Sequence, residues 1–409
     1  MSQQVNLNSI ADIFKYLSPD FIKDPFYYYR QMPPEERLLL RSPGYWVTAD
    51  YTIIEEIFKD KRFKRNFWKN KVDQFGEKIK LEPCLSVMSN WMLMVNPPDH
   101  GRLRDLTAPF FSRAHIEKLR LNIEAEANRL IDVVIMRGNM DIISEFSIPF
   151  SIKFMHQILG IPEKDRKEVL AKTFLPRRLF DPPTPLSREE MDLENFNTQQ
   201  LADYVAKLCV KKESNPQNDL ISYLLNANNA GQLSKEECVS QIILLLVAGL
   251  DTVPHMIGNS ILALHQHPHQ LNELKLNPSL FPTALHELLR FAPPVHMVNS
   301  EASEDIDMCG YLLKKGDKIT SLLAAGNRDP KIFQNPDTLD LSRPKKRLLS
   351  FSGGIHSCLG MHLALMLFEI GLQALLKKIP NMQLVDLHQP EWNLTYSVHG
   401  LARLRAQWH

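Results

Sequence analysis

Hydrophobic residues recur along much of the chain with the spacing of an α-helix. Over residues 116–134 they return at steps of three and four, and Gly138 is a suitable stop. Ser234 and Glu237 have the spacing of a capping box, followed by a long apolar stretch. This stretch predicts a long helix that runs to about His265.

Prolines mark the ends of two further predicted helices. Pro282 suits the first turn of one helix, which should end before Pro293. Another helix should begin near Leu359 and end before Pro380. Strand-like segments are fewer, at 45–48 and in short pieces between 306 and 323. The pattern predicts a mostly α fold with a small β region.

Composition and charge narrow the class of protein. The 409 residues hold 48 Lys and Arg against 47 Asp and Glu, so no strong field attracts nucleic acid or an anionic membrane. The longest apolar run, 242–250, is far shorter than the roughly 18 residues that a membrane span needs. Five cysteines without a CxxC pair argue against a disulfide framework or a zinc module. We expect a soluble, cytoplasmic, monomeric protein without a membrane anchor, with one domain over 1–409.

The segment 351–360, Phe-Ser-Gly-Gly-Ile-His-Ser-Cys-Leu-Gly, has the most informative chemistry. Gly353 and Gly354 permit a tight turn and a close approach of the backbone to a flat group. Cys358 lies where a helix is predicted to begin, and the free N–H groups there stabilise a thiolate. An iron-binding sulfur fits these conditions, but so does a buried, unreactive cysteine. Zinc is less suited, because only His356 lies nearby with the spacing of a ligand.

This segment resembles the signature of the cytochrome P450 family, Phe-Gly-x-Gly-x-His-x-Cys-x-Gly. The residues that match are Phe351, Gly354, His356, Cys358 and Gly360, and the chain departs at Ser352, where glycine is usual. The resemblance implies the cytochrome P450 fold, with heme b (iron protoporphyrin IX) between the long central helix and the cysteine loop. Cys358 would be the iron ligand, and a thiolate ligand favours cleavage of the O–O bond.

Other segments follow in the order of the family. Glu287 and Arg290 have its Glu-x-x-Arg spacing and share a helix face, and Arg343 follows in a segment similar to that which completes the family's network. The resemblance implies a structural network that supports the heme pocket. The alternative is a solvent-exposed ion pair on a helix, which a Glu-x-x-Arg sequence forms more commonly.

The segment that begins at Asn96 looks like the family's Pro-Pro-x-His-x-x-x-Arg element. His100 and Arg104 are four residues apart on one helix face, and the resemblance implies that they bind the heme propionates. The arginine that commonly joins them is replaced by Ser300. Our hypothesis is that His100, Arg104 and His356 bind the propionates, alone or with His296 or Asn299. A structure that shows an arginine from elsewhere on the same propionate would refute it.

Ala248, Gly249, Asp251 and Thr252 match the family's Ala/Gly-Gly-x-Asp/Glu-Thr element within the long apolar helix. The resemblance implies that Ala248 and Gly249 border the heme and that Asp251 with Thr252 delivers protons to dioxygen. The alternative without a catalytic role is a polar patch that faces solvent, or a threonine bonded to the preceding turn. Pro254 cannot donate to the carbonyl of residue 250, so we expect the helix to open near Gly249.

The resemblance implies a monooxygenase that inserts one oxygen atom from dioxygen into a largely apolar small molecule such as a terpenoid, fatty acyl or polyketide-like compound. Electrons would come from NAD(P)H through a ferredoxin-type donor and its reductase, and the basic run 345–347 is a candidate surface for an acidic donor. By resemblance, the substrate pocket should draw on residues 66–95, 170–205, 244–252, 291–299 and 393–399. A peroxide-using heme-thiolate enzyme and a non-catalytic heme binder remain the alternatives.

Overall fold

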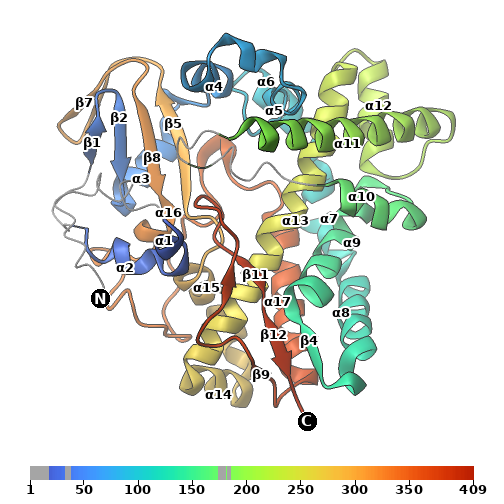
Figure 1. Ribbon diagram of the computed structural model, residues 1–409, viewed down its shortest axis with the longest axis vertical. Helices are drawn as coiled ribbons and strands as arrows, with labels where there is room; N and C mark the ends of the chain where they lie inside the picture. The colour runs from blue at the N-terminus through green and yellow to red at the C-terminus, as the bar shows by residue number, and fades with distance from the viewer. Residues whose placement is uncertain (1–17, 33–37, 174–180, 182–185) are drawn as a thin grey trace.

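The computed structural model describes residues 18–32, 38–173, 181 and 186–409. Helices form most of it, and the strands form small sheets (Figure 1). The α-helices are α1 (Pro19–Lys23), α2 (Pro25–Tyr29), α3 (Tyr51–Lys59), α4 (Phe67–Phe75), α5 (Pro83–Ser89), α6 (Asp99–Thr107), α7 (Arg113–Glu117), α8 (Arg120–Val134), α9 (Ile148–Leu159), α10 (Arg166–Lys172), α11 (Arg188–Ser214), α12 (Leu220–Asn229), α13 (Lys235–Gln266), α14 (Pro268–Leu276), α15 (Phe281–Phe291), α16 (Leu323–Gly326) and α17 (Met361–Lys378). The strands are β1 (Leu39–Ser42), β2 (Tyr45–Thr48), β3 (Phe63–Lys64), β4 (Asn139–Asp141), β5 (Met297–Ala302), β6 (Ile306–Met308), β7 (Tyr311–Leu313), β8 (Lys318–Leu322), β9 (Gln383–Leu384), β10 (Glu391–Trp392), β11 (Leu401–Arg403) and β12 (Arg405–Gln407). The predicted mostly α fold with a small β region is confirmed.

The long helix α13 passes through the centre of the molecule and packs against α9, α11 and α17 (Figure 1). Its start is the predicted capping box, in which Ser234 and Glu237 bond to each other's backbone N–H. The helix is long and apolar enough to cross a membrane, but 89% of its most apolar window is buried inside the protein. Its hydrophobic face is therefore used as the core of the fold.

Prolines and glycine end the other predicted helices close to the expected residues. α15 ends at Phe291, before the proline pair, and α17 ends at Lys378, two residues before Pro380. The stretch 116–134 is divided between α7 and α8, and Gly138 follows with a left-handed φ of 73°. The missed break between α7 and α8 is a local change within one amphipathic pattern, to which hydrophobic spacing is insensitive.

A five-stranded sheet lies beside the helices in the order β1-β2-β8-β5-β3 (Figure 1). β2 and β8 are parallel, and the other pairs are antiparallel. β3 pairs with β5 so that Phe63 faces Ala302 and Lys64 faces Glu301. This edge of the sheet brings the segment after β3 next to the segment where the expected propionate arginine is missing.

Glu287, Arg290 and Arg343 form the network that the spacing predicted. Glu287 and Arg290 are 1% and 0% exposed, and their side chains form two bonds of 2.7 and 2.8 Å. Arg343 Nε donates to the same carboxylate at 3.1 Å. The alternative of a solvated pair is excluded, because both side chains are buried.

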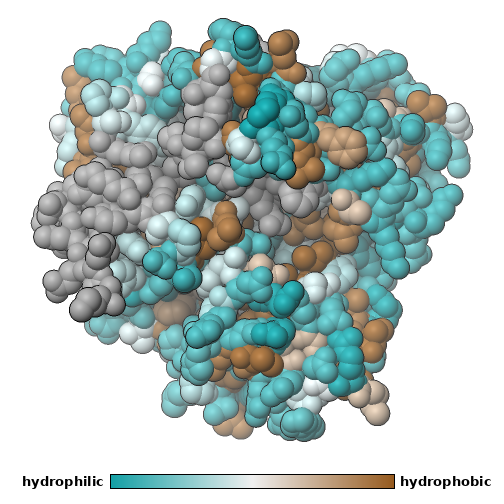
Figure 2. Space-filling view, in the orientation of Figure 1, coloured by the Kyte–Doolittle hydropathy of each residue, from teal (hydrophilic) through white to brown (hydrophobic). Residues whose placement is uncertain are grey.

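The apolar residues left at the surface are dispersed. Figure 2 shows that hydrophilic residues cover most of the described surface on this face, with apolar residues in small separate patches. This distribution is typical of a protein whose hydrophobic residues are used mainly for its core.

Candidate active site

The loop before α17 carries Cys358. The backbone N–H of Cys358 donates to the carbonyl of Phe351 at 3.0 Å, which closes the loop, and Gly360 is the N-cap of α17. The thiol is exposed. Desolvation by the surrounding protein raises its pKa more than the N–H of Gly360 and the charge of Arg104 lower it. The expected stabilisation by the helix end is therefore too weak by itself, and a bound metal ion would have to favour the thiolate.

The two glycines of this loop lie against α3. A Cβ on Gly354, whose φ is 61°, would lie 1.8 Å from the carbonyl oxygen of Phe58, and one on Gly353 would lie 2.9 Å from the Phe58 side chain. The two glycines therefore permit a close approach of this loop to the end of α3, and their approach to a flat group stays a prediction. The sequence could not indicate this neighbour, because α3 lies about 300 residues earlier in the chain.

Ser352, where the chain departs from the family signature, adopts a left-handed φ of 58°. Its hydroxyl is buried without a hydrogen-bond partner in the structure. An L-residue is strained in this region, and glycine is not. The family's usual glycine is thus the residue that this backbone favours.

We expect Ser352→Gly to raise the free energy of unfolding by about 1 kcal/mol, because relief of left-handed strain exceeds the extra entropy of glycine in the unfolded chain. Urea unfolding of the heme-loaded protein, followed by circular dichroism, measures the change. Ser86→Gly in the exposed face of α5 is the control and should destabilise by about 0.5 kcal/mol. A destabilising Ser352→Gly would contradict the assignment of strain.

His100, Arg104 and His356 come together as predicted. The rings of His100 and His356 are 4.5 Å apart, and Arg104 Nη2 donates to Ser357 Oγ at 3.3 Å. His356 Nε2 is buried without a hydrogen-bond partner in the structure. Burial lowers the pKa of His356 to about 3, with smaller effects from the charges of Arg65, His100 and Arg104. This cluster presents donors and positive charge without a carboxylate partner among the described residues.

The middle of α13 has one open face. Ala248 is exposed although most of its helix neighbours are buried, and Thr252, one turn later, is half-buried. Gly249 lies on another face, where a Cβ would be 3.1 Å from Met155, and its carbonyl accepts a bond of 2.8 Å from Ser151 Oγ. An exposed alanine inside a buried helix indicates open space beside it.

The opening or kink predicted near Gly249 does not divide α13 into two helices. The helix is continuous from Lys235 to Gln266 with Pro254 inside it. Tertiary packing on most sides of α13 holds the helix together although proline removes one backbone donor.

His255 is a residue that the sequence analysis missed. It lies one turn after Asp251, and its Nε2 is 3.8 Å from Asp251 Oδ1. Its ring also lies 3.3 Å from Asn393 Nδ2 and occupies the space that a Cβ on Gly400 would need. The i, i+4 spacing is a signal that could have indicated this pair. Both Asp251 and His255 are buried, so the carboxylate is held within the core.

A cavity of about 400 Å³ joins four of the five ranges expected around the substrate. Its apolar lining includes Phe67, Leu93, Met94, Met297 and Val298. Asp181 and Ser397 also line it, and Asp181 accepts bonds from the backbone N–H groups of Tyr396 and Ser397. The range 244–252 does not contribute to its described lining.

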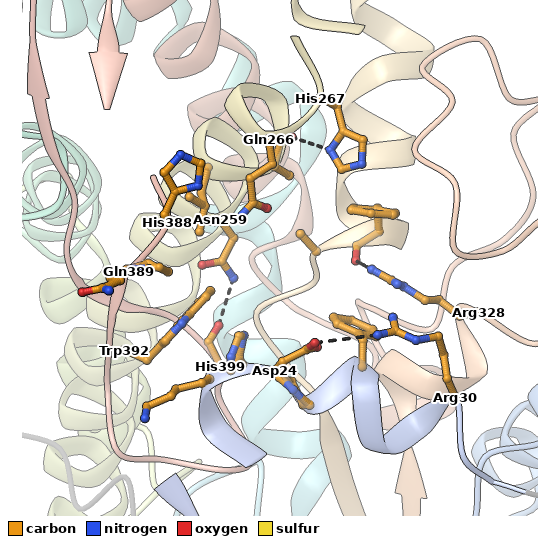
Figure 3. Close-up of a pocket in the computed structure, with 18 residues that line it drawn as sticks. Asp24, Arg30, Asn259, Gln266, His267, Arg328, His388, Gln389, Trp392 and His399 are labelled. Atoms are coloured by element: carbon orange, nitrogen blue, oxygen red, sulfur yellow. Dashed lines mark hydrogen bonds and ion pairs between the residues drawn. The ribbon is translucent and has the colours of Figure 1, made fainter. Parts of the chain in front are cut away.

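A separate cavity of about 660 Å³ lies between α2, the end of α13 and the C-terminal segment (Figure 3). Phe291, which we expected at the substrate, lines this cavity, and the Arg328 guanidinium lies 4.1 Å from its ring. His296 bonds to Tyr29 Oη at 3.2 Å and packs 4.7 Å from His399, so it does not join the His356 cluster. Ala292 and His399, which also lie in ranges expected at the substrate, line this cavity too, whereas none of the residues predicted to bind heme or deliver protons does.

These residues fit a heme. Cys358 offers an accessible sulfur, Ala248 and Thr252 border open space, and the His356 cluster offers donors for two carboxylates. A flat, dianionic iron porphyrin matches each of these features. The fold and this site define a heme-thiolate protein.

Comparisons with known proteins agree with this class of protein. A family model described as Cytochrome P450 matches residues 279–381. The chain is 35% identical over 379 residues to the biotin biosynthesis cytochrome P450 of Bacillus subtilis (strain 168), covering 92% of this chain and 93% of the relative. The polyketide biosynthesis cytochrome P450 PksS of the same organism is 35% identical over 386 residues, with 92% and 93% covered.

Solved structures are similar over nearly the whole chain. P450BioI in complex with hexadec-9Z-enoic acid ligated acyl carrier protein has a TM-score of 0.87 and 34% identity, covering 95% of this chain and 100% of that chain. Myxobacterial CYP267B1 in complex with myristic acid has a TM-score of 0.87 and 32% identity, with 97% and 99% covered. The chain belongs to the cytochrome P450 family. It is accordingly a heme-containing oxidoreductase of the monooxygenase class.

Proposed function

We propose that this cytochrome P450 inserts one oxygen atom from dioxygen into a long acyl chain, as a fatty acyl or polyketide-like compound. The observation that carries this proposal is the apolar lining of the 400 Å³ cavity, with polar groups at other parts of its wall. Burial of a chain against such a lining contributes about 0.8 kcal/mol per CH₂ group. The names of four similar proteins point the same way, since they mention a hexadecenoyl carrier protein, myristic acid, biotin and a polyketide.

The polar part of the cavity suits the head of such a molecule. Lys64, Asn66, Asn70 and Lys71 line it, and burial lowers the pKa of Lys71 to about 8, partly offset by Asp181. Several amide and ammonium donors can therefore meet a carboxylate, an ester or a thioester. The cavity is compatible with both a free acid and a carrier-bound acyl group, because the polar end of the substrate would lie among polar side chains in each case.

Different residues of the chain would have different roles in the reaction. Bound heme supplies the activation of dioxygen at its iron. Cys358 would hold the iron from one side, while His100, Arg104 and His356 would hold the propionates. Asp251 and Thr252 lie in the middle of α13, where they would bring protons to the oxygen side through a hydrogen bond or one water. The surrounding buried residues of α13 would exclude other water.

We propose that electrons come from NAD(P)H through a ferredoxin-type donor and its reductase. The exposed basic run 345–347 precedes the cysteine loop by only a few residues, and Arg347 lies 3.1 Å from Glu55 on α3. An acidic donor bound there would lie close to the Cys358 side of the molecule. Such an encounter should weaken as salt is added.

The substrate proposal is tested by titrating the heme-loaded protein with myristic acid, hexadec-9-enoic acid, a terpene and a steroid, and by following the heme spin-state change. We expect the fatty acids to bind most tightly. Val298→Asp should raise their Kd at least about tenfold, because it places a charge in the apolar wall.

Val133→Asp is the matched control, because Val133 is 71% exposed on α8, and it should leave the Kd unchanged. Equal effects of the two variants, or tighter binding of the steroid than of either acid, would contradict an acyl substrate.

A further inference from the structure

The cation expected at the heme propionates is missing from β5, where residue 300 is serine. Arg65 lies on the neighbouring chain segment. β3 and β5 are antiparallel, with Phe63 opposite Ala302 and Lys64 opposite Glu301. Continuing this register by one residue places Arg65 opposite Ser300. Directly opposite residues of an antiparallel pair extend from the same face, with Cβ atoms about 5 Å apart.

Contacts on both sides hold the Arg65 backbone in this place. Its N–H donates to Asn96 Oδ1 at 2.8 Å, and its carbonyl accepts from Asn96 Nδ2 at 2.7 Å. Asn96 begins the element that carries His100 and Arg104. The next residue, Asn66, donates to the buried Glu301 on β5 at 2.8 Å. Arg65 is thus tied to the propionate-binding element and to β5.

The Arg65 side chain extends toward the cluster of His100, Arg104 and His356. Its Nη1 donates to the carbonyl of Asn299, the residue before Ser300. Both Arg65 and Ser300 line the 400 Å³ cavity, and the charge of Arg65 acts on His356. Desolvation lowers the pKa of Arg65 to about 10, and no carboxylate of the described residues forms an ion pair with it. Arg65 is half-buried, and a partly desolvated cation without a carboxylate partner is stabilised by an anion.

We propose that Arg65 binds a heme propionate in place of the arginine that is absent at Ser300. The positive charge is supplied from the opposite strand of the same ladder, and the family's donor set is completed from another segment of the chain. This inference rests on the bound heme of the proposed function. It is an alternative to our hypothesis that His100, Arg104 and His356 act alone or with His296 or Asn299, and the experiment below decides between the two.

The test exchanges Arg65 and Ser300, which lie opposite each other on the continuation of the β3–β5 pairing. It uses the heme-loaded protein and two measurements that do not depend on turnover. One is the rate of heme transfer to excess apomyoglobin, and the other is the reduction potential of the heme. Arg65→Ser should release heme about tenfold faster, on the scale of one charge-assisted hydrogen bond. It should also lower the potential, because a cation near the propionates favours the reduced heme.

The double variant Arg65→Ser with Ser300→Arg should restore both values toward those of the wild type. Arg62→Ser is the matched control, because Arg62 is an exposed arginine near the same strand that pairs with Asp60. It should change neither readout.

Two results would overturn the proposal. One is that Arg65→Ser matches Arg62→Ser in both heme release and potential. The other is that Arg65→Ser releases heme faster with an unchanged potential and is not rescued by Ser300→Arg, which would assign Arg65 a structural role only. Failure of the wild-type protein to retain heme would instead refute the proposed function, so the two failures are distinguishable.

Discussion

Cys358→Ser is expected to abolish the thiolate-type absorption band of the reduced carbon monoxide complex and, with it, detectable monooxygenase activity. A serine hydroxyl in this loop has a far higher pKa than a thiol and gives iron much less electron density. The loop itself should remain closed, because its 3.0 Å bond joins the backbone of residue 358 to Phe351. The spectrum of the reduced, carbon monoxide-bound protein measures the change directly.

Cys309→Ser is the control, because Cys309 is also an exposed cysteine and lies in the β6–β7 turn. It should keep the wild-type band. A thiolate-type band in Cys358→Ser would show that another atom holds the iron and would overturn the assignment of the site.

Asp251→Asn and Thr252→Ala are expected to lower product formation with dioxygen and redox partners by about 10²-fold, the scale on which a positioned proton donor contributes. The fold should persist, since Asp251→Asn conserves volume, Thr252→Ala shortens a side chain that is only half-buried, and the helix is held by packing along its length. NAD(P)H consumption should fall less than product formation. The measurement is the ratio of product formed to NAD(P)H consumed.

Hydrogen peroxide separates this role from the peroxide-using alternative. Added peroxide carries its own protons and electrons, so the two variants should keep most of the wild type's peroxide-driven activity. Asp203→Asn, an exposed carboxylate on α11, is the control and should keep full coupling. Wild-type turnover with peroxide that equals turnover with redox partners would favour the alternative enzyme.

Local patterns predicted much of the secondary structure. The capping box at Ser234, the prolines after α15 and α17, and strand β2 were all found at or near their expected residues. These signals depend on neighbouring residues, so a single sequence contains them in full. The opening or kink predicted near Gly249 does not interrupt α13, because packing by distant helices holds the helix together although Pro254 lacks a backbone donor.

The residues of the candidate site were likewise predicted only where the signal is local in the sequence. The motif around Cys358 identified its loop, and the spacing of His100 and Arg104 identified their shared face. His255 beside Asp251, Phe58 beneath Gly354 and Phe291 at the other cavity were not predicted. Each of these depends on which surfaces meet across the fold or on which side of a helix is covered.

The sequence by itself determined the family, the loop of the candidate iron ligand Cys358 and the order of the main helices, because these follow from residues close together in the chain. Only the tertiary structure brought Arg65, which we propose as the substitute for the absent arginine, next to Ser300. Arg65 and Ser300 are 235 residues apart in the chain, and they become neighbours only through the pairing of β3 with β5. A hydrogen-bonded strand register is a property of the folded chain, and local spacing contains no record of it.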